Sequence, residues 1–243
     1  MSKVFLALPS YDGHMEQGAF GPIAHSKAHL AQPLGSSLLC YTFNQLFCMA
    51  LNMRSKGFTH WAILHADICP LQNDWLDTLR SEMERVGADV MSAVVPLKSN
   101  DGLTSTGLAV QEFYAKRYGG VEELDPWAVK RLTMKEIYDL PETFTDENLV
   151  VNSGCMIVDI TKPFAEKICF TIQDRIVRDE NGEFKALVFS EDWSFSQQVR
   201  KLGGSIWATR KVGLYHVGKN CFFNTSVFGS CESDPKWEDE KID

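Results

Sequence analysis

The stretch that decides the fold is residues 61–70, Trp61-Ala62-Ile63-Leu64-His65-Ala66-Asp67-Ile68-Cys69-Pro70. An apolar, β-prone run ends at Leu64, and an acidic side chain follows at Asp67 before the run stops at Pro70. We therefore expect a buried internal strand with Asp67 at its carboxyl edge, where open α/β sheets bind ligands. The alternative is that Asp67 only caps the helix that follows.

Composition limits the classes of protein to which the chain can belong. Its 243 residues, 44% of them hydrophobic, suffice for one domain. A net charge of −8 argues against an extended nucleic-acid surface. Its short N-terminal apolar run does not resemble a signal peptide, no stretch has membrane-spanning length, and the seven cysteines are scattered without a CxxC pair. We expect a cytoplasmic protein with reduced core cysteines.

The first hundred residues alternate between strand and helix patterns. Apolar residues recur at helical spacing between Ser37 and Lys56 and again between Leu71 and Val86. Buried strands are expected at Val4 to Leu8, at Trp61 to Leu64 and at Val90 to Leu97. Because helices join these strands, they are expected to be parallel.

The second half of the chain is less regular. Gly119 to Asp146 suits loops or short helices, with Pro126 and Pro141 as breaks. Order returns with apolar segments from Leu149 to Val158, which Asn152-Ser153-Gly154 interrupts. A helix is expected from Ser190 to Gly204, with Glu191 and Asp192 in its first turn. Short strands follow and end at His216.

The order of these polar sites resembles that of the GT-A glycosyltransferases, especially the family 2-like group, from about Val4 to Gly218. This resemblance implies a three-layer α/β/α sandwich with a mostly parallel central sheet and a Rossmann-like nucleotide-binding half. It also implies one catalytic domain over 1–243, divided into a nucleotide-sugar-binding half at 1–100, an acceptor half at 101–220 and a C-terminal tail at 221–243.

The resemblance assigns the donor site to two strand ends. The loop Pro9, Ser10, Tyr11 and Asp12 would hold the nucleotide, and His65-Ala66-Asp67 stands where the family has its DxD motif. Asp67 matches the metal-binding aspartate, and His216 matches a histidine that contacts the metal or diphosphate. The chain departs from the family at His65, which replaces an acidic residue, so we place His65 with the nucleotide-binding residues and leave a core role open.

The acceptor side is assigned in the same way. Glu191 and Asp192 match the acidic motif that supplies the general base of inverting enzymes, and Asp192 is the expected base. The alternative is that two first-turn acids only stabilise the helix dipole, by ~0.3–1 kcal/mol each. The residues expected to bind sugar or acceptor are Asn152, Ser153, Gly154 and Trp193.

The resulting hypothesis is a metal-dependent glycosyltransferase that uses a nucleotide-sugar donor, an acceptor of unknown identity and Mn²⁺ or Mg²⁺. A nucleotidyltransferase and a non-catalytic nucleotide-sugar-binding module are the alternatives. Ser10 to Gly35, which contains His14, His25 and His29, is expected to be a substrate-shaping loop. A metal pair at His25 and His29, four residues apart, is the less favoured reading of that segment.

Overall fold

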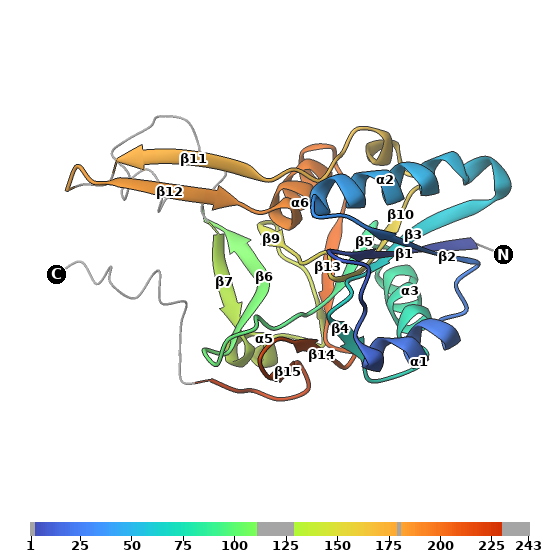
Figure 1. Ribbon diagram of the computed structural model, residues 1–243, viewed down its shortest axis with the longest axis horizontal. Coiled ribbons are helices and arrows are strands. Elements are labelled where there is room, and N and C mark those ends of the chain that lie inside the picture. Colours follow the sequence, from blue (N-terminus) through green and yellow to red (C-terminus); the bar gives the residue numbers. More distant parts are fainter. Residues whose placement is uncertain (1–2, 111–128, 179–180, 230–243) are drawn as a thin grey trace.

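A seven-stranded sheet forms the centre of the protein (Figure 1). The computed structural model describes residues 3–110, 129–178 and 181–229. The strand order is β2-β1-β3-β10-β5-β13-β8. The strands are β1 (Lys3–Ser10), β2 (Leu30–Gly35), β3 (Phe58–Leu64), β5 (Val90–Ala93), β8 (Thr143–Phe144), β10 (Cys155–Asp159) and β13 (Ile206–Thr209).

The sheet is mixed and partly parallel. The β1–β2, β1–β3 and β5–β13 pairs are parallel, as expected for strands joined by helices. Strand β10 runs antiparallel between β3 and β5, and β8 runs antiparallel to β13. Residues Cys155 to Val158 are fully buried, as expected for an apolar strand at an internal position of the sheet.

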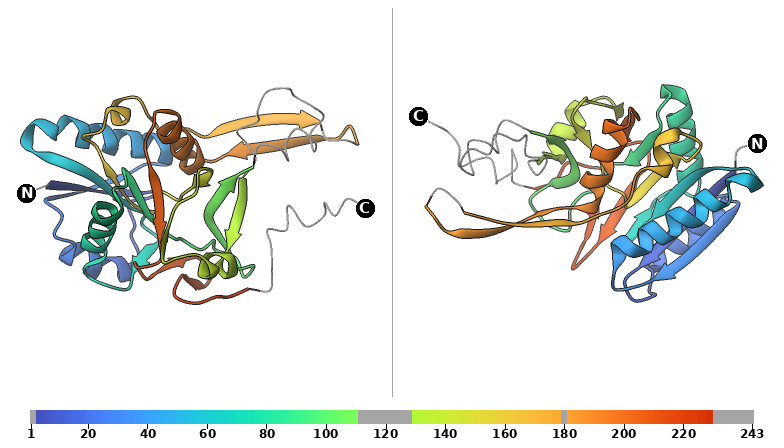
Figure 2. Two further views of the ribbon diagram at one scale, coloured as in Figure 1. Left: turned by 180° about the vertical axis from the view of Figure 1, so that it is seen from behind. Right: turned by 90° about the horizontal axis from the view of Figure 1, so that it is seen from above.

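Helices cover both faces of the sheet (Figures 1 and 2). On one face, α2 (Leu39–Asn52) and α6 (Glu191–Lys201) contribute Phe43, Phe47 and Phe195 to the larger apolar cluster. On the other face, α1 (Gln17–His25) and α3 (Trp75–Val86) enclose a second cluster that contains Trp75. The periodic patterns predicted α2, α3 and α6 correctly, because each has one continuous apolar stripe.

The segment Ser10 to Gly35 is not the loop that we expected, because it contains both α1 and β2. Helix α1 was missed because it carries Pro22 and two glycines. One of them, Gly18, allows close packing, since a Cβ there would lie 2.0 Å from the Tyr215 hydroxyl. Strand β2 contains Pro33, which is tolerated because β2 is the edge strand of the sheet.

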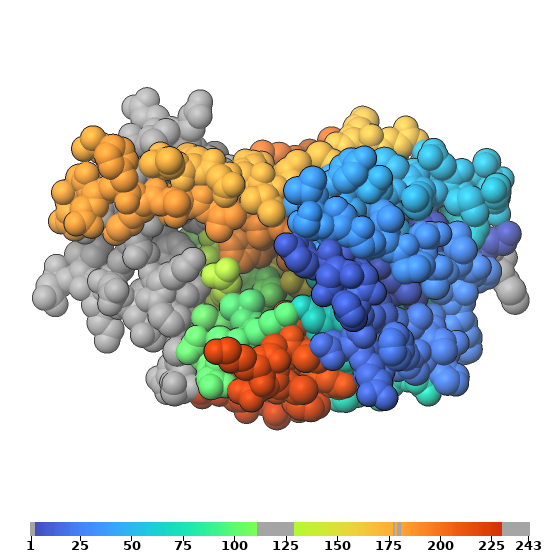
Figure 3. Space-filling view, in the orientation of Figure 1, coloured from blue at the N-terminus to red at the C-terminus, as the bar shows by residue number. Residues whose placement is uncertain are grey.

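Three small antiparallel sheets surround the main one. A hairpin of β11 (Gln173–Arg178) and β12 (Phe184–Phe189) projects from the body as an orange arm (Figure 3). The other strands are β4 (Ile68–Pro70), β6 (Leu103–Ala109), β7 (Val129–Thr133), β9 (Leu149–Val150), β14 (Leu214–Val217) and β15 (Cys221–Phe223). The short helices are α5 (Met134–Asp139), η1 (Arg54–Lys56) and η2 (Pro163–Glu166).

The two proposed halves share one sheet, since β10 and β13 pair with strands of the first hundred residues. The expected C-terminal tail starts at Cys221, but Cys221–Phe223 form β15, which pairs with β14, so this part belongs to the folded body. Asn224 is buried there and its amide donates to the carbonyl oxygens of Val94 and Val212, each at 2.9 Å. The rest of the expected tail, residues 230–243, lies outside the described residues.

Two expectations from composition can be compared with the structure. Cys69 and Cys155 are buried, whereas Cys48, Cys169 and Cys221 are exposed, so the cysteines are not mainly core residues. In the described ranges, none of the helices combines the length and the apolar character needed to cross a membrane.

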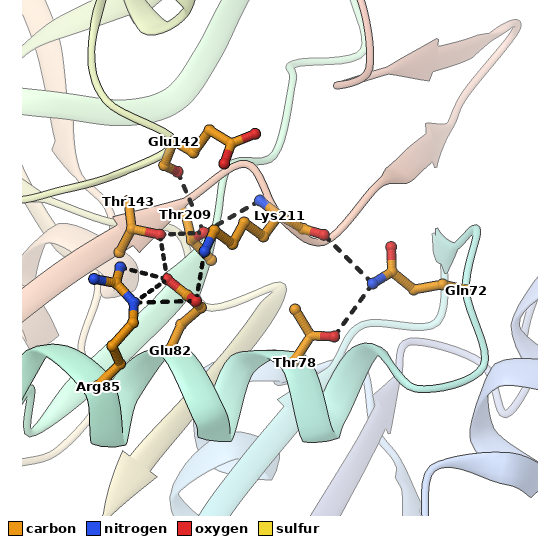
Figure 4. A network of polar contacts seen from close by, with 8 residues as sticks. All are labelled: Gln72, Thr78, Glu82, Arg85, Glu142, Thr143, Thr209 and Lys211. Atoms are coloured by element: carbon orange, nitrogen blue, oxygen red, sulfur yellow. Dashed lines mark hydrogen bonds and ion pairs between the residues drawn. The ribbon is translucent and has the colours of Figure 1, made fainter.

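A polar network fixes the turn that leads into β14 (Figure 4). Glu82 on α3 accepts hydrogen bonds from Arg85, from Lys211 at 2.7 Å and from Thr143 at 2.7 Å. Nearby, the Gln72 amide oxygen accepts from Gly213 N at 3.1 Å. Hydrogen bonds from Arg85 have the largest effect on the pKa of Glu82 and lower it. Burial acts to raise this pKa, but hydrogen bonds from Lys211 and Thr143 add to the lowering, and the pKa falls to about 2.

Replacing Glu82 by Gln should reduce the free energy of unfolding by about 1–3 kcal/mol, because the network loses a buried charged acceptor. The folded pKa is lower than the unfolded one, so the contribution of Glu82 is complete above pH ~4.5 and is lost as the pH falls toward 2. Urea unfolding at pH 7 and pH 3 measures this. An equal Glu82→Gln deficit at both pH values would contradict the prediction.

Candidate active site

A cavity of ≈ 430 Å³ opens at the carboxyl ends of β1 and β3. It is lined by the loop after β1, by Leu39 and Phe43 of α2, and by the residues that follow β3. Its size lies in the range typical of small-molecule sites. The cavity brings together the predicted nucleotide-binding residues and one predicted metal ligand: Pro9, Ser10, Tyr11, Asp12, His65 and Asp67.

The loop after β1 is held by its own short side chains. The Ser10 hydroxyl accepts a hydrogen bond from Gly13 N at 3.0 Å, and the Asp12 carboxylate accepts one from His14 N at 3.0 Å. The ring of Tyr11 is 65% exposed at the mouth of the cavity. Ser10 therefore shapes the loop, whereas Tyr11 offers an aromatic face to a ligand.

Asp67 lies between β3 and β4, at the carboxyl edge of an internal strand, as predicted. It does not cap a helix, because the next helix, α3, begins at Trp75 with Asp74 as its N-cap. The helix-capping alternative for Asp67 is therefore wrong. Its carboxylate is 36% exposed and faces the cavity.

His216 reaches Asp67 because β14 pairs antiparallel with β4, with His216 opposite Ile68. Its Nε2 lies 3.5 Å from Asp67 Oδ2, and its Nδ1 lies 2.8 Å from the carbonyl oxygen of Pro96. Since a carbonyl only accepts hydrogen bonds, Nδ1 carries the proton and Nε2 faces the carboxylate. Metal-binding histidines commonly have this arrangement.

Lys98 is the residue that sequence reasoning missed. Its ammonium group makes an ion pair with Asp67 Oδ2, the same oxygen that His216 faces. Burial acts to raise the pKa of Asp67, but the contacts with His216 and Lys98 outweigh it and hold that pKa well below its usual range. The available signal was its position just after the apolar run Val90 to Leu97.

His65 lies between the cavity and the Asn152-Ser153-Gly154 step. Its ring lies 4.9 Å from the ring of Phe43, and its Nε2 lies 3.4 Å from the Ser153 hydroxyl. Burial lowers the pKa of His65 to about 4, so the ring is neutral at pH 7. A neutral ring carries no charge that could pair with a phosphate. It can still form a hydrogen bond with the Ser153 hydroxyl.

The step Asn152-Ser153-Gly154 carries the chain from β9 to β10 and meets α6. Asn152 donates to Asp192 Oδ2 at 2.9 Å, and Ser153 donates to Asp192 Oδ1. Burial and then the charge of Glu191 raise the pKa of Asp192 to about 7, against the opposing hydrogen bonds from Ser153 and Asn152. Burial also raises the pKa of Glu191, which is less buried than Asp192.

Trp193 does not face the acceptor region as expected. It is 7% exposed and packs with Val129, Val150 and Phe189, away from the cavity residues. Its indole N–H donates to the carbonyl oxygen of Ser105 at 3.2 Å. An aromatic ring enclosed in this way cannot stack on a sugar, so Trp193 is a structural residue.

The histidines of the N-terminal segment do not form a metal pair. Helix α1 ends at His25, whereas His29 lies beyond it and its Nδ1 accepts a hydrogen bond from Val4 N at 3.2 Å. Within the residues that the structure describes, no cluster of three or more His, Cys, Asp or Glu side chains could hold a metal. A metal at Asp67 and His216 would therefore take its remaining ligands from water or substrate.

Comparisons with known proteins inform the fold alone. No protein-family model matches the chain, and no curated protein matches it. Among solved structures, A197 from STIV matches with a TM-score of 0.53 and 14% identity, over 95% of this chain and 98% of that chain. The two proteins therefore share a mixed α/β fold along nearly their whole lengths.

Gly154 leaves no room for a side chain, which gives a test of the site's packing. A Cβ there would lie 2.2 Å from Ile68 Cδ1 and 2.5 Å from Asn152 Oδ1. Gly154→Ala should lower the free energy of unfolding by about 1–3 kcal/mol. Gly21→Ala is the matched control, since its Cβ would meet only Asn73 Oδ1 at 3.9 Å. Equal stability of the two variants in urea would contradict the described geometry.

Proposed function

We propose that the chain is a metal-dependent glycosyltransferase that moves a sugar from a nucleotide-diphosphate sugar to an acceptor hydroxyl with inversion. One observation carries the proposal: Asp192, Ser153 and His65 form a continuous polar path from the start of α6 to the cavity wall, where His65 and Asp67 both lie. In this proposal the acidic pair and the metal-ligand pair act on one substrate.

The cavity takes the nucleotide in this proposal. Tyr11 stacks on the base through its exposed ring, and Asp12 hydrogen-bonds the ribose. The backbone of Pro9 and Ser10 forms the floor of that subsite. The diphosphate then points along His65-Ala66-Asp67 toward His216.

Asp67 and His216 would hold the divalent cation through a carboxylate oxygen and Nε2. Two protein ligands suit Mn²⁺ or Mg²⁺, which keep waters and share coordination with substrate phosphates. The cation supplies charge neutralisation for the leaving diphosphate. The hydrogen bond between His216 Nδ1 and the Pro96 carbonyl keeps Nε2 directed at the site.

Asp192 is the proposed general base. A carboxylate with a pKa of about 7 can accept the proton of an acceptor hydroxyl near neutral pH. Asn152 and Ser153 fix its orientation by donating to its two oxygens, and Gly154 keeps the adjacent backbone compact. Glu191 is the alternative base, because it is the less buried member of the pair.

The first experiment is a thermal-shift screen of nucleotide-sugars with and without Mn²⁺, because a ligand that binds only the folded state raises the melting temperature. Donors that stabilise the protein are then assayed for hydrolysis. Binding with slow metal-dependent hydrolysis supports the proposal. Binding without hydrolysis or transfer to any acceptor would favour a non-catalytic nucleotide-sugar-binding module, and release of pyrophosphate from a nucleoside triphosphate would favour a nucleotidyltransferase.

Asp67→Ala should abolish the Mn²⁺-dependent part of nucleotide-diphosphate affinity and leave the fold intact, because one of two protein ligands is removed. His216→Ala should weaken the same response less, since the carboxylate remains. Calorimetric titration in Mn²⁺ and in EDTA measures both effects. The proposal is contradicted if wild type and Asp67→Ala bind equally in the two conditions.

Asp192→Asn should lower the turnover rate about 10²- to 10⁴-fold with little change in donor affinity, because the proton moves only during transfer. The wild-type rate should rise with pH and level off above about pH 7, where the carboxylate is deprotonated. Asp77→Asn, another first-turn acid on α3, is the control and should keep normal turnover. Normal turnover in Asp192→Asn would contradict the inverting mechanism proposed here and would favour Glu191 as the base or a retaining enzyme that needs no such base.

A further inference from the structure

The ion pair with Asp67 holds the ammonium group of Lys98 at a place where the proposed function needs positive charge. Lys98 Nζ contacts Asp67 Oδ2, and the carboxylate belongs to the wall of the ≈ 430 Å³ cavity. The Lys98 side chain is 38% exposed and that of Asp67 is 36% exposed, so solvent or a ligand can reach both groups. An ammonium has three protons, and Asp67 Oδ2 accepts one of them.

The position of Lys98 is fixed by the surrounding backbone. Leu97 N donates to the carbonyl oxygen of Leu103 at 2.9 Å, beside the bridge between Pro96 and Thr104. Gly218 makes room for the lysine stem, since a Cβ there would lie 3.2–3.4 Å from three Lys98 side-chain carbons. The ammonium is therefore directed at Asp67 by packing and not only by charge.

Lys98 and a divalent cation cannot both occupy Asp67 Oδ2 without strong repulsion, because two positive charges would meet at one oxygen. His216 Nε2 already faces the same oxygen at 3.5 Å. A metal that binds Asp67 Oδ2 and His216 Nε2 would therefore compete with the ammonium for that oxygen. The displaced ammonium remains within reach of any anion that binds beside the metal.

We propose that Lys98 is a diphosphate-binding residue that pairs with Asp67 in the empty site and transfers its ion pair to the donor diphosphate when the site is filled. The inference deepens the proposed function and rests on it for the identity of the diphosphate. Lys98 then gives the site an affinity for diphosphate that does not require the metal ion. Binding of the metal ion increases this affinity further.

Inorganic pyrophosphate is the probe, because it carries the charge of the diphosphate without a base or sugar. Calorimetry in EDTA compares wild type with Lys98→Met, Lys98→Arg and the exposed-lysine control Lys219→Met. Lys98→Met should bind pyrophosphate about 10- to 100-fold more weakly than wild type. Lys98→Arg should retain most of the affinity because it keeps the charge, and Lys219→Met should resemble wild type.

Binding of Mn²⁺ alone, followed by electron paramagnetic resonance, gives a second readout that needs no activity. Lys98→Met should bind Mn²⁺ several-fold more tightly, because the competing ammonium is gone. Weaker Mn²⁺ binding by Lys98→Met, unchanged pyrophosphate affinity, or an equal loss in Lys219→Met would overturn the inference. Failure to hydrolyse any nucleotide-sugar would instead reject the glycosyltransferase proposal and leave the pyrophosphate result standing.

Discussion

The antiparallel insertion of β10 between β3 and β5 is the constraint on which the site depends. In this register, His65 N donates to the carbonyl oxygen of Gly154 at 2.8 Å, directly after the last pair of the two strands. That hydrogen bond brings the segment before β10 to the end of β3, and Ser153 comes within reach of His65. If β10 were parallel, its amino end would lie at the opposite edge of the sheet, far from Asp67.

A second pairing completes the arrangement from the other side. Strand β14 carries His216 to Asp67 through β4. The turn before β14 is anchored by Glu82 of α3 and by Gln72 of the loop before α3 (Figure 4). The candidate metal ligands are therefore held by backbone pairing and by a polar network at the turn that leads into β14. Rigid support of this kind is what keeps functional side chains in a productive geometry.

Sequence reasoning succeeded where one local pattern determined the structure. Helix and strand periods are local properties of a sequence. They therefore predicted the apolar stripes of α2, α3 and α6 and the strand end before Asp67. Sequence reasoning failed where tertiary context determined the structure. The direction of β10 depends on its neighbours, and helix α1 depends on packing against Tyr215 through Gly18, so neither leaves a local signal.

The candidate site divides in the same way. Asp67, His216, Asn152, Ser153 and Asp192 were predicted as separate strand-end or helix-start residues. The structure joins Asn152 and Ser153 to Asp192 and brings His216 to Asp67. Trp193 was misplaced because residues in the first turn of a helix can face the core or the solvent, and sequence position alone does not separate the two. Lys98 was missed because a single lysine after a strand resembles any solvated residue.

The β11–β12 hairpin has a consequence for work with the purified protein. Ile176, Phe184 and Val188 are 78%, 67% and 61% exposed, and the register of the hairpin puts them on one face. Among the residues that the structure describes, this sheet consists of two strands, and apolar edge strands are prone to pair with strands of neighbouring molecules. Self-association at high concentration would begin at this arm. Lysine at Ile176 or Val188 is the natural change for improving solubility, because both positions lie outside the buried core.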